Sequence, residues 1–173
     1  WNTECDYTKS KSNKAKEKLH YSRMIRKILV PLDGSRNSYR GLDEAISLVK
    51  QCTRWIRSGK MASIIGIYVK DVPGVYALHP IGWIGFHSIF EKEGKRIIAQ
   101  ARTKCAKKGV TFHGKILGGD PPYDIVRFAH NNRNGINMIV IGARGRGTLK
   151  GIFLGSVSNY VIHKSKIPVL VVK

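Results

Sequence analysis

Short apolar runs alternate with longer segments of helical periodicity along this chain, and no other feature restricts the fold as strongly. Between the runs, apolar residues recur about every 3.6 positions, as they do on the buried face of a helix. Regular alternation of this kind predicts a parallel sheet built from βα units, hence an α/β fold. The five runs of strand length lie at residues 27–32, 62–69, 110–117, 137–142 and 167–172.

Four helices are predicted, one after each of the first four strands. Their starting points, in chain order, are the turn Asp33-Gly34-Ser35 with Ser35 as N-cap, residue 86 of a helix that ends near 108, Asp120 as a cap with Pro121 in the first turn, and Gly155 with Ser156. The residues predicted to face the core are Leu42, Ala45, Ile46, Val49 and Cys52, then Phe86, Phe90, Ile97, Ala101 and Cys105, then Ile125, Val126 and Ala129, and finally Val157, Tyr160 and Val161.

Residues 71–85 combine proline and glycine with large apolar side chains. We expect a loop here, because the segment is too rich in helix-breaking residues for a long helix. A loop of this length is often functional. It could form a lid or a partner surface, or simply pack across the end of the sheet, and the sequence leaves these alternatives open.

The length of 173 residues, 42% of them hydrophobic, fits one domain with a substantial core. Residues 1–23 are polar and basic and have no apolar segment typical of a signal peptide. We expect them to be a leader that is disordered or not native to the domain. The domain is predicted at residues 24–173, with Met24 as a candidate natural start.

Several classes of protein are disfavoured by composition. The three cysteines are widely spaced and form no CxxC pair, which favours a reducing cytoplasm over a disulfide framework. The six histidines include no pair at helical metal-ligand spacing, so we expect no metal bound by protein side chains alone. The apolar runs fall far short of the roughly 20 residues that cross a bilayer, so we expect no membrane segment.

The formal net charge of +20 raises a nucleic-acid or acidic-partner hypothesis. The charge is dispersed along the chain, however, and no recognition motif or basic stripe interleaved with aromatic residues accompanies it. Nucleic-acid binding therefore stays an alternative that only the charge supports.

A cluster of glycines follows the fourth predicted strand. The segment "GARGRGTLKGIFLGS" places glycines at 142, 145, 147, 151 and 155. It matches neither the P-loop, because no Gly-Lys-Ser/Thr triplet occurs, nor the dinucleotide fingerprint GxGxxG. Glycine at a strand end lets the backbone approach a ligand, and a Gly-Ser that opens a helix offers free N–H groups to an anion. The pattern indicates phosphate binding, with tight turns as the alternative.

The spacing Gly142-x2-Gly145-x9-Gly155-Ser156 resembles the G-x2-G-x9-G-[ST] signature of the universal stress protein family (UspA-like domain), in its ATP-binding branch. Four further stretches are similar to that family and occur in the same order: "KILVPLDGS", "GDPPYDIV", "MIVIGARG" and "GSVSNYVIHKSKIPVLVV". The resemblance covers about residues 24–173.

The resemblance implies a single doubly wound, open, parallel sheet of five strands in the order 3-2-1-4-5, with helices on both faces, similar to Rossmann-like and adenine nucleotide alpha hydrolase-like folds. Ligands in such sheets bind where the winding direction reverses, here between the first and fourth strands. The nucleotide site implied by the family consists of Pro31, Leu32, Asp33, Val69, Ile141, Gly142, Gly145, Gly155, Ser156, Val157 and Ser158.

The family also implies roles within this site. Asp33 would serve the ribose or a metal-associated end, although it could also form an Asx-turn. Pro31, Leu32 and Val69 would border adenine. Ile141 and Gly142 would lie beneath the nucleotide, and Gly145 would let the chain pass the phosphates. Residues 155–158 would donate N–H or hydroxyl groups to phosphate, with Ser156 as a simple N-cap left open. Arg144 and Arg146 occupy variable positions, so the resemblance assigns them no role.

The resemblance implies an ATP-binding stress-response or signalling module with little or no hydrolysis, ATP being bound alone or with Mg²⁺. It also implies a cytoplasmic homodimer that pairs through residues 167–172. A slow ATPase or adenine-nucleotide hydrolase is the first alternative, and a basic nucleic-acid-binding protein is the second.

Overall fold

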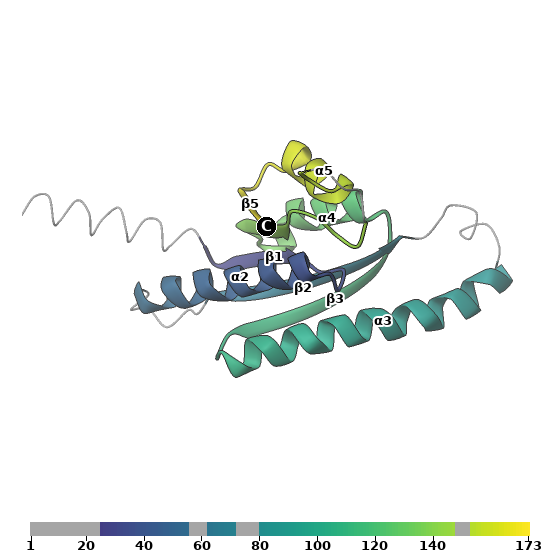
Figure 1. The fold of residues 1–173 in the computed structure, drawn as a ribbon, viewed down its shortest axis with the longest axis horizontal. Coiled ribbons are helices and arrows are strands. Elements are labelled where there is room, and N and C mark those ends of the chain that lie inside the picture. The colour runs from purple at the N-terminus through teal and green to yellow at the C-terminus, as the bar shows by residue number, and fades with distance from the viewer. Residues whose placement is uncertain (1–24, 56–61, 72–79, 148–152) are drawn as a thin grey trace, which may run out of the picture.

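A computed structural model of the protein describes residues 25–55, 62–71, 80–147 and 153–173. Figure 1 shows a twisted sheet between two layers of helices. The strands are β1 (Lys27–Pro31), β2 (Ser63–Asp71), β3 (Thr111–Gly119), β4 (Met138–Gly142) and β5 (Val169–Val172). They are all parallel and pair in the order β3-β2-β1-β4-β5. The predicted α/β class and strand order are confirmed.

Helices cover both faces of the sheet (Figure 1). Helices α2 (Arg36–Trp55) and α3 (Pro80–Lys107) pack on one face, and α4 (Pro121–His130) and α5 (Ser156–Lys164) pack on the other. A short 3-10 turn, η2 (Asn132–Asn134), follows α4. Strand β1 feeds both cores, because successive side chains of a strand point to opposite faces. Ile28 and Val30 belong to the α2–α3 core, and Leu29 belongs to the α4–α5 core.

The predicted helix faces are the observed ones where the structure describes their side chains. Cys52, Val157 and Tyr160 are half-buried against the same cores. The fully buried members of the prediction are Leu42, Ala45, Ile46, Val49, Ile97, Ala101, Cys105, Ile125, Val126, Ala129 and Val161.

The turn between β1 and α2 forms as predicted. Gly34 has a φ of +82°, a left-handed conformation that glycine adopts without strain. The Asp33 carboxylate accepts from the Ser35 N–H at 2.9 Å, which makes an Asx-type turn. Ser35 then caps α2, because its Oγ accepts from the Ser38 N–H at 3.2 Å. These local bonds fix the turn between the end of β1 and the start of α2.

Helix α3 begins earlier than the sequence suggested. The predicted loop 71–85 is wrong at both ends, because Asp71 still belongs to β2 and residues 80–85 are already helical. Pro80 stands at the first helical position, where proline costs no hydrogen bond and its fixed φ suits the helix. Residues 72–79 lie outside the described residues, so a lid or partner role for this segment stays a prediction.

The start of α4 is at the predicted place, but the predicted side-chain cap is wrong. Asp120 occupies the N-cap position without a capping bond from its own carboxylate. Instead, Asp124 Oδ2 accepts from the Asp120 N–H at 2.9 Å. The other oxygen of this buried carboxylate pairs with Arg127 Nη2 at 2.7 Å. Asp124 therefore fixes the helix start from inside the first turn.

Some predictions fall outside the residues that the structure describes. They concern the leader 1–23 and Met24, as well as Lys150 and Gly151 of the glycine segment. In the part of the chain that the structure describes, no helix is both long and apolar enough to cross a membrane.

Candidate functional site

A cavity of about 760 Å³ opens at the carboxyl end of the sheet, where β1 and β4 lie side by side. The chain leaves β1 toward one face of the sheet and leaves β4 toward the other, so the two loops diverge around an open space. Segments far apart in sequence meet there: the ends of β1, β2 and β4, the start of α4, the glycine loop and the start of α5. The volume falls within the usual range for small-molecule sites.

All eleven residues that the family resemblance implied line this cavity. One wall is apolar and comes mainly from the strand ends. It contains Pro31, Leu32 and Val69 from the implied site, and also Ile67 and Ile125, which sequence reasoning missed. These two belong to the α4–α5 core, and only the packing of α4 against β2 brings them to the cavity. The wall is suited to a flat apolar group such as a base.

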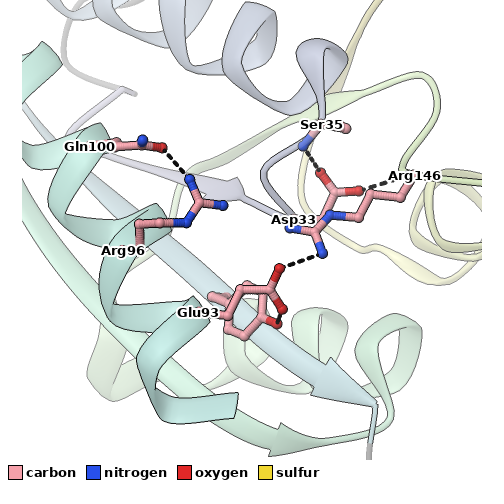
Figure 2. Close-up of polar contacts among 7 residues, drawn as sticks. Asp33, Ser35, Glu93, Arg96, Gln100 and Arg146 are labelled. Atoms are coloured by element: carbon pink, nitrogen blue, oxygen red, sulfur yellow. Dashed lines mark hydrogen bonds and ion pairs between the residues drawn. The ribbon is translucent and has the colours of Figure 1, made fainter. Parts of the chain in front are cut away.

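Asp33 holds the two loops of the cavity together. Its Oδ1 accepts from the Ser35 N–H, and its Oδ2 accepts from the backbone N–H of Arg146 at 3.1 Å (Figure 2). The carboxylate thus bonds the turn after β1 to the glycine loop, more than a hundred residues later. Each carboxylate oxygen has a second lone pair, so Asp33 can still accept a hydrogen bond from a ligand.

Two of the signature glycines are required by close backbone approaches. A Cβ on Gly145 would lie 2.6 Å from Asp33 Oδ2, so glycine lets the loop pass the carboxylate. A Cβ on Gly142 would lie 2.6 Å from the carbonyl carbon of Asn37, in the first turn of α2. Both separations are far below van der Waals contact. These glycines therefore have a structural task in shaping the cavity, whatever the ligand.

The start of α5 supplies hydrogen-bond donors at the cavity edge. Gly155 is the N-cap and Ser156 the first helical residue, so the alternative of Ser156 as N-cap is wrong. The Gly155 N–H donates to Ala143 O at 2.8 Å, and the Ser158 Oγ lies 2.7 Å from the same carbonyl. Neither group is a free donor. In the described part of the chain, no acceptor takes the N–H groups of Ser156, Val157 or Ser158.

These three N–H groups face the cavity from the positive end of a helix dipole. The family resemblance assigned residues 155–158 as phosphate donors. The structure leaves the backbone N–H groups of residues 156–158 and the exposed Ser156 hydroxyl as donors, because the Ser158 hydroxyl is already bonded. Packing does not require glycine at 155, because a Cβ there would meet other atoms of the described residues only at ordinary contact distances of 3.5 Å or more.

Arg146 turns its side chain away from the start of α5. Its Nη1 pairs with Glu93 Oε1 on α3 at 2.6 Å (Figure 2). The Tyr68 hydroxyl donates to Glu93 Oε2 at 3.1 Å. The hydrogen bond from Arg146 is the main cause that lowers the pKa of Glu93. Burial, and then the bond to Glu93, raise the pKa of Tyr68 to about 12. At neutral pH the pair is therefore charged and the phenol is neutral.

Other residues complete the rim. Arg144 is half-buried at the cavity, and Phe153 lines it with 61% of its surface exposed. The Lys173 ammonium lies 3.8 Å from the centre of the Phe153 ring. The sequence placed Arg144 and Arg146 beside the glycines, but it could not predict the direction or the partners of their side chains. Nothing in the sequence placed Glu93 near the cavity, because Glu93 lies on α3 and belongs to none of the motifs.

The arrangement is suited to an elongated anion with an apolar end. An apolar wall, a carboxylate and the start of a helix all line the same cavity. Asp33 is the only carboxylate that lines it among the described residues. In the same part of the chain, no three His, Cys, Asp or Glu side chains gather as a protein metal site would require.

Comparison with known proteins relates this chain to one family. The model of the universal stress protein family matches residues 24–173. Universal stress protein YxiE of Bacillus subtilis is 35% identical over 156 residues, which cover 87% of this chain and 100% of YxiE. The solved structure of MJ0577 from Methanocaldococcus jannaschii gives a TM-score of 0.72 at 27% identity, and the match covers 87% of this chain and 96% of that one.

A solved structure with a bound nucleotide shares the fold. It is a universal stress protein family member from Arabidopsis thaliana with AMP bound. Its TM-score to this chain is 0.57 at 18% identity, and the match covers 85% of this chain and 90% of the Arabidopsis one.

Proposed function

Because the chain belongs to the universal stress protein family, we propose that it binds an adenine nucleotide, and ATP above all, in the cavity at the carboxyl end of its sheet. One observation carries the proposal. The eleven residues implied by the family signature converge from five segments on a single cavity. Together they supply the three kinds of group that a base, a ribose and phosphates would need: apolar side chains, a carboxylate and helix N–H groups.

The residues present fit such a ligand. The base would lie against Pro31, Leu32 and Val69, and the ribose would reach Asp33 through its remaining lone pairs. The phosphates would accept from the N–H groups of residues 156–158, as anions commonly do at helix N-termini. Mg²⁺ usually binds proteins through one or two carboxylates together with substrate phosphates. Asp33 is the carboxylate here that could complete such a site.

The protein acts as a stress-response or signalling module that binds ATP and hydrolyses it little or not at all. Hydrolysis requires a positioned water, a base and stabilisation of the developing charge. Asp33 is the only lining carboxylate among the described residues, and it already accepts from two backbone N–H groups. Free Cys52 and buried Cys105 are compatible with a reducing cytoplasm, where we place the protein.

The protein forms a homodimer through β5. All four residues of this strand are only half-buried, and in the described residues no strand pairs with its outer edge. An exposed edge of valine and leucine favours pairing with another strand. A second copy that adds its own β5 would cover the edge by an isologous, two-fold contact.

Thermal unfolding with ATP, AMP, cAMP, GTP or adenosine tests the nucleotide proposal. ATP at about 100 times its dissociation constant should stabilise the fold by about 2.7 kcal/mol, and GTP should stabilise it less. The proposal is wrong if no adenine nucleotide raises the melting temperature. Release of ADP on the order of once per second would instead favour an enzyme.

A matched pair of variants tests the phosphate donors. Ser156→Pro removes the N–H of the first helical residue, a position that accepts proline. Gly155 before it has φ −76° and ψ 165°, which a following proline tolerates. Loss of a hydrogen bond to a charged group should weaken ATP binding by about tenfold or more. Ser156→Ala removes the same hydroxyl but keeps the N–H, so the difference in ATP affinity between the two variants measures the N–H alone. Both variants should bind adenosine equally.

A further inference from the structure

Arg146 connects the cavity to the opposite layer of the fold. Its backbone N–H donates to Asp33 on the cavity, while its guanidinium reaches over the end of the sheet to Glu93 on α3 (Figure 2). The side chain passes close to the turn after β1, since a Cβ on Gly34 would lie 2.7 Å from Arg146 Nη2. The guanidinium is thus near the cavity but bonded to a helix outside it.

The same guanidinium is within reach of a phosphate at α5. A Cβ on Gly155 would lie 3.6 Å from the backbone nitrogen of Gly145, so the glycine loop runs beside the start of α5. Arg146 is the next residue after Gly145. Its extended side chain spans roughly 6–7 Å at standard bond lengths. A rotation about its side-chain bonds could exchange Glu93 for a phosphate group, without movement of the loop backbone.

We infer that Arg146 is a phosphate-sensing residue that exchanges its Glu93 partner for the phosphates of the bound nucleotide. The inference deepens the proposed nucleotide binding and rests on it. Glu93 holds the guanidinium when no polyphosphate is present. ATP or ADP draws the guanidinium into the cavity, whereas adenosine leaves it on α3. Arg146 therefore distinguishes nucleotides by their number of phosphates, and its pair with Glu93 sets how strongly the phosphates must bind to displace it.

The exchange is energetically accessible because the Glu93–Arg146 pair is open to solvent. The Arg146 side chain is 48% exposed and that of Glu93 is 30% exposed. Ion pairs with such exposure contribute little, since water screens them and both side chains lose freedom. A polyphosphate carries several charges and can accept two parallel hydrogen bonds from a guanidinium. The ligand is thus the stronger partner, and Glu93 is the competitor it must displace.

The exchange would also change the contacts of α3 when the nucleotide binds. Glu93 bonds Tyr68 of β2 as well as Arg146, so it is the point where α3 meets both the sheet and the glycine loop. When Arg146 leaves, Glu93 keeps only the Tyr68 hydroxyl of these two partners. The contact between α3 and the nucleotide loop is lost, and the surface of α3 changes in charge near the cavity.

Isothermal titration with ATP and with adenosine tests the inference. Glu93→Gln removes the competing charge and should strengthen ATP binding about three- to fivefold, the range expected for an exposed ion pair. Adenosine affinity should stay within about twofold of wild type. Asp43→Asn is the matched control, because it removes one carboxylate from a 2.7 Å pair between α2 and α3 and that pair is not part of the cavity lining.

A double-mutant cycle isolates the exchange from general electrostatics. Arg146→Gln should weaken ATP binding but not adenosine binding, and Glu93→Gln should have no effect on ATP in that background. The inference is overturned if Glu93→Gln behaves like Asp43→Asn, or if its effect persists without Arg146. If the variants give either of these results while the wild type binds both adenosine and ATP, the inference fails and the proposed function stands. Wild-type protein that binds neither ligand contradicts both.

Discussion

At the scale of single residues, the glycines of the signature have different tasks. Gly142 lets the first turn of α2 pack directly on the end of β4, and Gly145 lets the loop pass Asp33. Gly155 is the N-cap of α5, and a Cβ there would meet only ordinary contacts. Among the described residues, a Cβ on Gly147 would meet nothing within 4 Å. The signature therefore combines two glycines that lie at close approaches with a third, Gly155, that this packing does not require.

This difference in packing predicts that an added methyl group destabilises the protein at Gly142 and has little effect at Gly147. Gly142→Ala would push a Cβ against the Asn37 backbone, which cannot move without shifting α2. We expect the free energy of unfolding in urea to fall by about 1–3 kcal/mol, as for overpacked sites. Gly147→Ala, the control in the same loop, should change it by less than about 0.5 kcal/mol. Equal losses in the two variants would contradict the packing argument.

At the scale of elements, β5 pairs with β4 along one edge, and no other strand of the described residues pairs with its second edge. Ile139 N donates to Pro168 O at 2.9 Å, and Ala143 N donates to Val172 O at 2.7 Å. Alternate residues of a strand direct their backbone groups to the same side. Residues 168, 170 and 172 therefore face β4 with their backbone groups, while those of Val169 and Val171 face outward.

Proline at an outward position should separate dimerisation from folding. Val171→Pro removes an outward N–H and leaves the hydrogen bonds to β4 in place, and edge strands tolerate proline there. We expect the wild type to have twice the 19.4 kDa chain mass in light scattering, and the variant to have the single mass with an unchanged circular dichroism spectrum. A monomeric wild type would contradict the dimer proposal, as would a dimeric, folded variant.

At the scale of the whole molecule, the positive charge is dispersed along the chain, but in its last part no acidic residue balances it. Of the net +20, a large share belongs to the last part of the chain, where residues 125–173 contain eight Lys or Arg and no Asp or Glu. This part forms most of α4, all of α5 and the glycine loop. Repulsion among these positive charges opposes the compact state, and their combined field attracts anions. An acidic or nucleic-acid partner stays a prediction that this asymmetry supports.

Self-repulsion predicts that salt stabilises the protein. Raising NaCl from about 20 to about 200 mM shortens the screening length several-fold. We expect the melting temperature to rise by about 2–4 °C, which corresponds to about 1 kcal/mol in a chain of this size. The double variant Lys164→Glu and Lys166→Glu replaces two exposed cations and lowers the net charge from +20 to +16. Its salt dependence should be smaller, and an equal or larger one would contradict the explanation.

Local patterns were enough to predict the class of the fold, the sequence of its elements and most of the buried positions. Strand and helix periodicity report which side of an element is buried, and the turn Asp33-Gly34-Ser35 forms from bonds within itself. The glycine spacing, through the family it resembles, also identified eleven residues that line one cavity. All of these depend on neighbours in the chain or on a fixed spacing, so they can be read from one sequence.

Contacts between distant segments could not be predicted in the same way. The tertiary structure decided that Arg146 pairs with Glu93 and that the glycine loop passes the Asp33 carboxylate at Gly145. It also decided that the Gly155 N–H and the Ser158 hydroxyl are already bonded and do not remain as donors. It decided as well that the Asp120 carboxylate makes no capping bond at the N-cap of α4 and that the Asp124 carboxylate instead accepts from the Asp120 N–H. A side chain with several possible partners is oriented by whichever group the packing of the layers brings nearest, and no periodicity encodes that distance.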